Sequence, residues 1–138
     1  STSIDLPKRD AAYLEKYRSI LEKRTPGSDA DAYRAAIAVA FAERKSPLPM
    51  SAMRIGDISF LFLPGEPMLA FQRYAYSLRP QKITVVAGYG DVASGYLCTD
   101  AAFEEGGYEP SAANAGPGTE ARFKQAIQKL LGPSGPTR

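Results

Sequence analysis

The sequence predicts an α/β fold: a small mixed sheet that contains a β-hairpin and a right-handed βαβ unit, flanked by helices. Two observations lead to this class. A helical stripe lies between two apolar runs, and the strand–helix–strand order favours a parallel pair joined by a right-handed crossover. A Gly-Asp dipeptide between strand-like segments is typical of a hairpin turn. The 138 residues suit a single unit with a helical part (8–45), an α/β part (50–131) and a frayed tail (132–138).

Two helices are predicted in the helical part. Residues 8–24 carry an apolar stripe at helical spacing, formed by Tyr13, Leu14, Tyr17, Ile20 and Leu21. Residues 29–45 follow a break at Thr25-Pro26-Gly27, and Ser28 with Asp31 would form a capping box. The expected apolar face of this second helix consists of Tyr33, Ile37, Ala40 and Phe41.

The α/β part begins with the hairpin and the βαβ unit. Residues on either side of Gly56-Asp57 form the hairpin, and the continuously apolar run at 58–63 is typical of a strand covered on both faces. Pro67 suits the first position of a helix, and residues 82–88 form the second parallel strand. The stripe of the connecting helix would be Met68, Phe71, Ala75 and Leu78.

The C-terminal third is predicted to contain two helices separated by a loop. Thr99 would cap a short helix that ends at Glu105. Residues 109–118 are rich in Pro, Gly, Ala and Asn and are expected to form a loop. Residues 117–131 show an amphipathic pattern, so they form the final helix.

Composition excludes several classes of function. The chain carries 17 Lys and Arg against 15 Asp and Glu, a net charge of +2, and these charges are scattered, so no nucleic-acid partner is expected. No apolar run approaches the roughly 18 residues of a membrane span. The single cysteine, Cys98, cannot form an internal disulfide. Because the chain has no histidine, it lacks the commonest general base and the imidazole metal ligand.

Two oxygen-bearing side chains follow the predicted parallel strands. Glu66 stands after the 58–63 run, where ligands tend to bind in α/β sheets, and is interpreted as a metal ligand, a catalytic base or a helix N-cap. Tyr96 follows the 82–88 strand and is interpreted as a metal-binding or proton-donating phenol, or as a buried tyrosine with a satisfied hydroxyl. Since the ends of parallel neighbours lie side by side, the two side chains are expected to converge.

Three further features have structural explanations. Residues 88–93 match the G-x-G-x-x-A pattern of a dinucleotide-binding loop, but that pattern must open a helix, which Ser94-Gly95 interrupts. Cys98 is expected to be a packed side chain, because no histidine can activate it. A solvated helix face is expected for the acidic residues Asp100, Glu104 and Glu105.

Six short motifs follow one another in a fixed order along the chain. The motifs are Met-Arg-Ile-Gly-Asp-Ile at 53–58, Leu-Pro-Gly-Glu-Pro at 63–67, Gly-Tyr-Gly at 88–90, Gly-Tyr-Leu-Cys-Thr at 95–99, Glu-Glu-Gly-Gly-Tyr-Glu at 104–109 and Gly-Pro-Gly at 116–118. With the amphipathic helix that follows, this ordered set resembles the C-terminal part of the catalytic domain of the neutral/alkaline ceramidase-like hydrolases. The resemblance covers roughly residues 48–131.

This resemblance implies a zinc-dependent amidohydrolase that cleaves N-acyl amides, including lipid-like ones. Glu66 matches the glutamate and Tyr96 matches the tyrosine that complete the family's zinc site. The family's two histidine ligands and its catalytic serine belong to the earlier part of the domain, so the catalytic residues are unknown for this chain. Cys98 replaces a threonine, and Pro67 stands where the ceramidases proper usually have Phe, which leaves ceramide specificity in doubt.

The chain is therefore expected to be the C-terminal part of a larger catalytic domain, inactive by itself, with zinc held only in the complete enzyme. Its partner would be the missing N-terminal half or another chain, and exposed apolar surface would favour self-association. A secreted or cell-envelope location is implied by the resemblance alone. The alternatives are a non-catalytic α/β interaction module and a nucleotide-binding domain that uses the 88–93 loop.

Overall fold

A four-stranded mixed sheet forms the centre of the α/β part in the computed structural model, which describes residues 1–25, 27, 29–90 and 94–132. The strand order is β1 (Thr2–Ile4), β2 (Leu48–Ile55), β3 (Ile58–Phe62) and β5 (Thr84–Ala87). The first three strands are antiparallel neighbours, whereas β3 and β5 are parallel. The predicted fold class, the Gly56-Asp57 hairpin and the parallel pair are confirmed.

Strand β1 has no counterpart among the predicted elements. It is three residues long and pairs Thr2 with Met50 and Ile4 with Leu48. Three residues are too few to show a strand period, so only the pairing with a segment more than forty residues away defines this strand.

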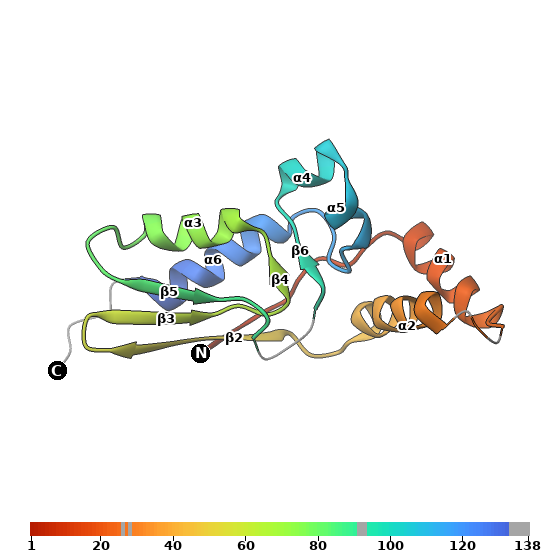
Figure 1. Ribbon diagram of the computed structural model, residues 1–138, viewed down its shortest axis with the longest axis horizontal. Coiled ribbons are helices and arrows are strands. Elements are labelled where there is room, and N and C mark those ends of the chain that lie inside the picture. The colour runs from red at the N-terminus through yellow and green to blue at the C-terminus, as the bar shows by residue number, and fades with distance from the viewer. Residues whose placement is uncertain (26, 28, 91–93, 133–138) are drawn as a thin grey trace.

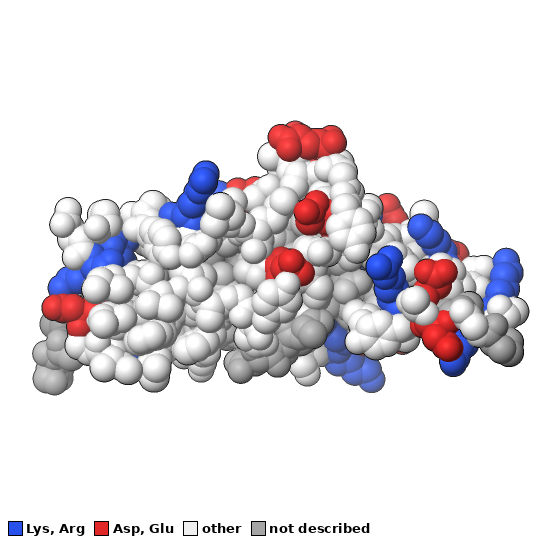
Figure 2. Space-filling view, in the orientation of Figure 1, with Lys and Arg blue, Asp and Glu red and all other residues white. Residues whose placement is uncertain are grey.

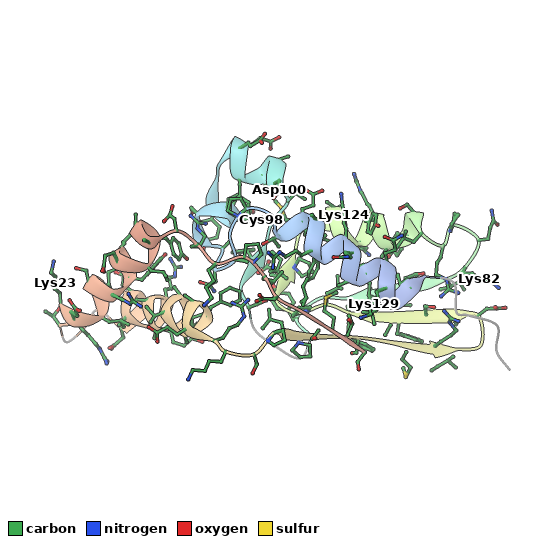
Figure 3. The ribbon with its side chains drawn as sticks, turned by 180° about the vertical axis from the view of Figure 1, so that it is seen from behind. Lys23, Lys82, Cys98, Asp100, Lys124 and Lys129 are labelled. Carbon is green, nitrogen blue, oxygen red and sulfur yellow. The ribbon has the colours of Figure 1, made fainter. Side chains whose placement is uncertain are left out.

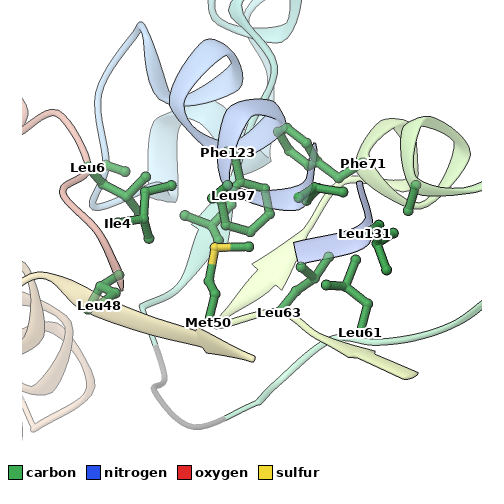
Figure 4. Packing of buried hydrophobic residues seen from close by; sticks show 14 of the residues in the cluster. Ile4, Leu6, Leu48, Met50, Leu61, Leu63, Phe71, Leu97, Phe123 and Leu131 are labelled. Carbon is green, nitrogen blue, oxygen red and sulfur yellow. The ribbon is translucent and has the colours of Figure 1, made fainter. Parts of the chain in front are cut away.

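Helices α3 (Leu69–Ser77) and α6 (Thr119–Leu131) lie together on one face of the sheet (Figure 1). Phe71 of α3 and Phe123 of α6 meet edge to face, with ring centroids 4.8 Å apart, and both are fully buried. The core-facing side chains of β2 and β3, and of the residue that follows β3, lie against them (Figure 4): Leu48, Met50, Leu61 and Leu63. The hydrophobic core therefore lies between these two helices and a single face of the sheet.

The opposite face of the sheet is apolar and exposed, so the prediction that residues 58–63 are covered on both faces is wrong. Burial alternates along β3: Ser59 and Leu61 are buried, whereas the other three residues, Ile58, Phe60 and Phe62, are only partly buried. The exposed fractions of the large side chains on the open face are 47% for Met53, 58% for Ile55, 61% for Ile83 and 42% for Val85. On the same face, Ile58 lies opposite Ile55, Phe60 lies opposite Met53 and Val85, and Phe62 pairs with Ala87. Figure 2 shows that the surface over these strands is mostly free of charged atoms.

The helical part forms a hairpin of α1 (Ala11–Glu22) and α2 (Asp29–Glu43), which extends away from the sheet (Figure 1). Helix α1 starts later than predicted because Asp10 is its N-cap and accepts a hydrogen bond of 2.8 Å from the Tyr13 backbone N–H. For α2, the proposed capping box with Ser28 lies outside the described residues.

The buried face of α2 differs from the expected one. It consists of Ala32, Ala35, Ala38, Phe41 and Ala42. The expectation was wrong for Tyr33, which is 69% exposed, and for Ala40, which is also exposed. Alanines give little hydrophobic contrast along a helix, so a stripe traced through the larger side chains selected the wrong face.

The base of the helical hairpin is fixed to the segment around residues 110–116. The Arg9 guanidinium donates to the Pro110 carbonyl oxygen at 2.6 Å and lies over the Tyr13 ring at 4.3 Å. The Tyr13 hydroxyl donates to the Asn114 side-chain oxygen at 3.5 Å. Because Asn114 is buried and its amide donates to the Ser94 carbonyl at 3.2 Å, this network ties α1 to the C-terminal third.

The C-terminal third contains α4 (Asp100–Glu105) and α5 (Tyr108–Ala112) before α6. Thr99 caps α4 as predicted, accepting from the Ala102 N–H at 3.2 Å. Helix α5 falls where a loop was expected; Pro110 stands in its first turn, where no backbone N–H is needed. No helix among the described residues is long and apolar enough to span a membrane. Most of the predicted tail, residues 133–138, lies outside the described part of the chain.

Candidate functional site

Glu66 and Tyr96 are paired neighbours in a two-stranded parallel sheet. The strands are β4 (Glu66–Pro67) and β6 (Tyr96–Leu97), and the register places Glu66 opposite Tyr96. The Glu66 N–H donates to the Gly95 carbonyl at 2.9 Å, and the Met68 N–H donates to the Leu97 carbonyl at 3.1 Å. Opposed residues on adjacent strands are about 5 Å apart and point to one face. The expected convergence of these two side chains is therefore present.

The local structure around them differs from the sequence prediction in two details. Glu66 is not a helix cap: helix α3 begins at Leu69 with Met68 as its N-cap, and Pro67 lies in β4. Tyr96 does not end the strand that pairs with β3, because it lies in a separate strand beyond the end of β5 at Ala87. The two residues are brought together by the pairing of β4 with β6 and not by the pairing of β3 with β5.

Gly65 allows β4 and β6 to approach. Its φ is +61°, in the left-handed region, and a methyl group at this position would lie 2.5 Å from the Gly95 carbonyl oxygen and against the Ser94 hydroxyl. The same Gly95 oxygen accepts the hydrogen bond from the Glu66 N–H. Only glycine satisfies both the backbone conformation and the contact, so the Pro-Gly-Glu motif has a direct structural role.

Tyr89 is a site residue that the sequence analysis did not single out. It has a positive φ of +53°, which is uncommon for a bulky residue, and its N–H donates to the Gly65 carbonyl at 2.7 Å. Its phenol forms a hydrogen bond with the Glu66 carboxylate, and this bond is the main reason that the pKa of Tyr89 is raised. Strained backbone that presents an exposed side chain to a carboxylate is typical of a functional position.

A cavity of about 470 Å³ lies between this strand pair and the helical hairpin. Glu66, Tyr89 and Tyr96 form one wall, and Lys16 and Arg34 belong to the opposite wall, on α1 and α2. The remaining lining residues include three further tyrosines, Tyr13, Tyr17 and Tyr108. The volume falls within the range of about 300–1,000 Å³ that is usual for small-molecule sites.

The Tyr96 phenol is protonated at neutral pH in this environment. Desolvation raises its pKa, the Glu66 carboxylate raises it further, and Arg34 acts in the opposite direction. The Tyr96 ring packs edge to face against Tyr108, with centroids 5.8 Å apart. Tyr96 can thus donate a hydrogen bond as it stands, whereas a metal would have to displace its proton.

Cys98 is not part of the cavity wall. The side chain is 1% exposed and packs with Ala102 and Ala113, and burial raises the pKa of its thiol to about 11. Figure 3 shows it from behind, close to Asp100. No group of three or more Cys, Asp and Glu side chains that could hold a metal occurs among the described residues. Besides Glu66, the oxygen-bearing side chains among the described cavity residues are those of the tyrosines, Ser111 and Asn114.

The remaining sequence features have structural roles. The Asp100 carboxylate accepts a hydrogen bond of 2.7 Å from the Gly118 N–H, which joins α4 to the start of α6, while Glu104 and Glu105 are exposed. Of the 88–93 loop, residues 91–93 lie outside the described part; the chain from Ser94 leads into β6, so the described residues provide no helix for a dinucleotide fingerprint.

Lys16 and Arg34 were not selected from the sequence either. Both lie on helices whose charged residues are expected to face solvent, and no motif marks them. Tyr89 could have been found from its position between Gly88 and Gly90 directly after a strand, since a side chain within a tight glycine turn is presented outward.

No protein-family model matches the sequence, and no curated protein sequence matches it. A solved structure is similar in fold: the neutral ceramidase from Pseudomonas aeruginosa matches with a TM-score of 0.57 and 16% sequence identity. The match covers 94% of this chain but only 23% of the ceramidase chain. The chain thus has a ceramidase-like fold and spans less than a quarter of the length of that enzyme.

Proposed function

We propose that this chain is the C-terminal portion of a ceramidase-like, zinc-dependent amidohydrolase that acts on N-acyl amides. The observation that supports this proposal most directly is the placement of Glu66 opposite Tyr96 in the wall of a cavity, within a fold similar to that of a neutral ceramidase. By the sequence resemblance, both residues match the motif positions that complete the zinc site of the ceramidase-like hydrolases.

The donor set fits zinc in part. Carboxylate oxygen is an ordinary zinc ligand, and a catalytic site usually has three protein ligands and one open position. Glu66 and Tyr96 would supply two of them, and no histidine is present to supply a third. The raised pKa of the Tyr96 phenol also weakens binding by these two residues alone. We therefore expect the other ligands to come from polypeptide outside this chain.

When bound, zinc would polarise the amide carbonyl and lower the pKa of a coordinated water. The residues of this chain would prepare the site. Tyr89 donates its hydroxyl hydrogen to the Glu66 carboxylate and so orients it. The aromatic surface around the cavity would hold the acyl portion of the substrate and exclude water.

The open face of the sheet fits the same proposal. A face that carries Met53, Ile55, Phe60 and Val85 without a covering layer exposes more apolar surface than a finished domain usually does. Since this chain spans 23% of the similar ceramidase, we propose that the rest of the catalytic domain covers this face. A non-catalytic interaction module is the alternative that the open face also supports.

Zinc calorimetry and an amide-release assay test the proposal on both the 138-residue chain and a longer protein that contains it. We expect the short chain to bind zinc weakly and to be inactive, and the longer protein to bind zinc and hydrolyse N-acyl amides. In the longer protein, Glu66→Gln and Tyr96→Phe should abolish hydrolysis, whereas the exposed controls Glu105→Gln and Tyr33→Phe should not. A zinc-free, inactive longer protein would favour the interaction module instead.

A further inference from the structure

We infer that the cavity selects a carboxylate-bearing substrate, an N-acyl amino acid, whose carboxylate is held by Arg34 and Lys16 on the helical hairpin. The assignment of an amide to this substrate rests on the proposed function, whereas the assignment of a negatively charged group does not.

Arg34 and Lys16 are cations that face the cavity without a carboxylate partner among the described residues. Other arginines of the same hairpin are paired and do not line the cavity: Arg18 with Glu43 at 3.1 Å and Arg24 with Asp29 at 2.9 Å. Arg34 forms no such pair, and Lys16 contacts only a ring, with its Nζ 5.6 Å from the Tyr17 centroid. Two positive charges without a carboxylate partner among the described residues therefore line the cavity that contains the candidate site.

The two walls are close enough to act on one small molecule. Both cations line the same cavity of about 470 Å³ as Glu66 and Tyr96. On the far wall Glu66 is the acidic residue among the described lining residues, and Tyr89 already donates to it. An anion would be repelled by Glu66 and attracted by Arg34, so it would lie on the hairpin side, with the uncharged part of the ligand beside Glu66 and Tyr96.

The planar shape of the Arg34 guanidinium favours a carboxylate as its ligand. A guanidinium donates two parallel hydrogen bonds to a carboxylate, and Lys16 adds a point charge beside it. The tyrosines that line the cavity provide ring faces and hydroxyl groups, which suit an acyl chain followed by an amide. An N-acyl amino acid has these three parts in the required order: acyl chain, amide and carboxylate.

Calorimetric titration of the 138-residue chain with matched probes tests this inference. The probes are N-octanoylglycine, its neutral counterpart N-octanoylglycinamide, and N-octanoyl-O-phosphoethanolamine. We expect the acid to bind about tenfold more tightly than the glycinamide, since a hydrogen bond to a charged group contributes about that factor. Arg34→Gln should remove this preference, Arg34→Lys should retain part of it, and the paired control Arg18→Gln should leave it unchanged.

Equal affinity of the wild-type chain for the acid and the glycinamide would overturn the inference, as would a preference that survives Arg34→Gln in a folded variant. Tighter binding of the phosphate probe than of the acid would overturn the carboxylate assignment. The measured quantity is the ratio of the dissociation constants for the acid and the glycinamide, determined without zinc. This inference can therefore fail while the longer protein binds zinc and hydrolyses N-acyl amides. Conversely, the acid can be preferred while the longer protein is zinc-free and inactive.

Discussion

Replacing Gly65 by alanine should separate β4 from β6 and destabilise the fold, and the structure provides a matched control for this change. Gly65 has a φ of +61° and Gly56, in the hairpin turn, has a φ of +57°. A methyl group on Gly56 would meet no atom within 4 Å, whereas one on Gly65 would lie 2.5 Å from the Gly95 carbonyl oxygen. The two substitutions therefore share the backbone cost and differ in the contact.

The magnitudes follow from these two contributions. A left-handed conformation costs an alanine about 1–2 kcal/mol relative to glycine, so Gly56→Ala should lower the free energy of unfolding by that amount. Gly65→Ala adds a steric contribution of about 1–3 kcal/mol, as in other overpacked interiors. The Gly95 oxygen cannot simply move aside, because it accepts the hydrogen bond from the Glu66 N–H at 2.9 Å. The expected total for Gly65→Ala is thus about 2–5 kcal/mol.

Urea unfolding followed by circular dichroism measures both variants under one set of conditions. The free energy of unfolding should be lower for Gly65→Ala than for Gly56→Ala by about 1–3 kcal/mol, with similar slopes against urea. Equal destabilisation would show that the close approach of Gly65 to Gly95 contributes nothing, and the account of the Pro-Gly-Glu motif would then be wrong.

Three further perturbations have defined outcomes. Phe71→Ala should lower the free energy of unfolding by about 3–5 kcal/mol in the same assay, because its ring is fully buried against Phe123; a loss below about 1 kcal/mol would contradict the described core. Glu66→Gln should lower the pKa of Tyr89 towards its ordinary value, measured from tyrosinate absorbance against pH, and an unchanged titration curve would disprove the hydrogen bond. Because the folded-state pKa of Tyr89 is raised, the contribution of this hydrogen bond to stability is complete at neutral pH and is lost as the pH rises through the folded-state pKa. The 138-residue chain should self-associate through the open sheet face, and Ile55→Lys with Val85→Lys should make it monomeric in light scattering; a wild-type monomer at high concentration would argue against an incomplete domain.

The features that the sequence by itself determined are those encoded within a few residues. Thr99 and the Ala102 N–H that it caps are three positions apart, and the Gly56-Asp57 turn joins two strands that are contiguous in the chain. The stripe of α3 that contains Phe71 and Ala75 repeats every four residues. Periodicity, capping and turn geometry depend on neighbours in sequence, so they can be recognised without knowing what the elements pack against.

Tertiary structure alone decided which surfaces meet. Whether one or both faces of β3 are covered depends on the position of α3 and α6, and the continuously apolar run at 58–63 is compatible with either arrangement. The buried alanines of α2 and the strand β1 become defined only through partners distant in the chain.

The candidate site shows the same division. The motif that contains Glu66 can be recognised locally, but its neighbours Tyr96 and Arg34 are separated from it by about thirty residues in either direction. Lys16 and Arg34 are indistinguishable in sequence from the solvated charges of any helix. They become part of a cavity because the Arg9, Tyr13 and Asn114 contacts hold the helical hairpin against the strand pair, and long-range packing of this kind leaves no local pattern.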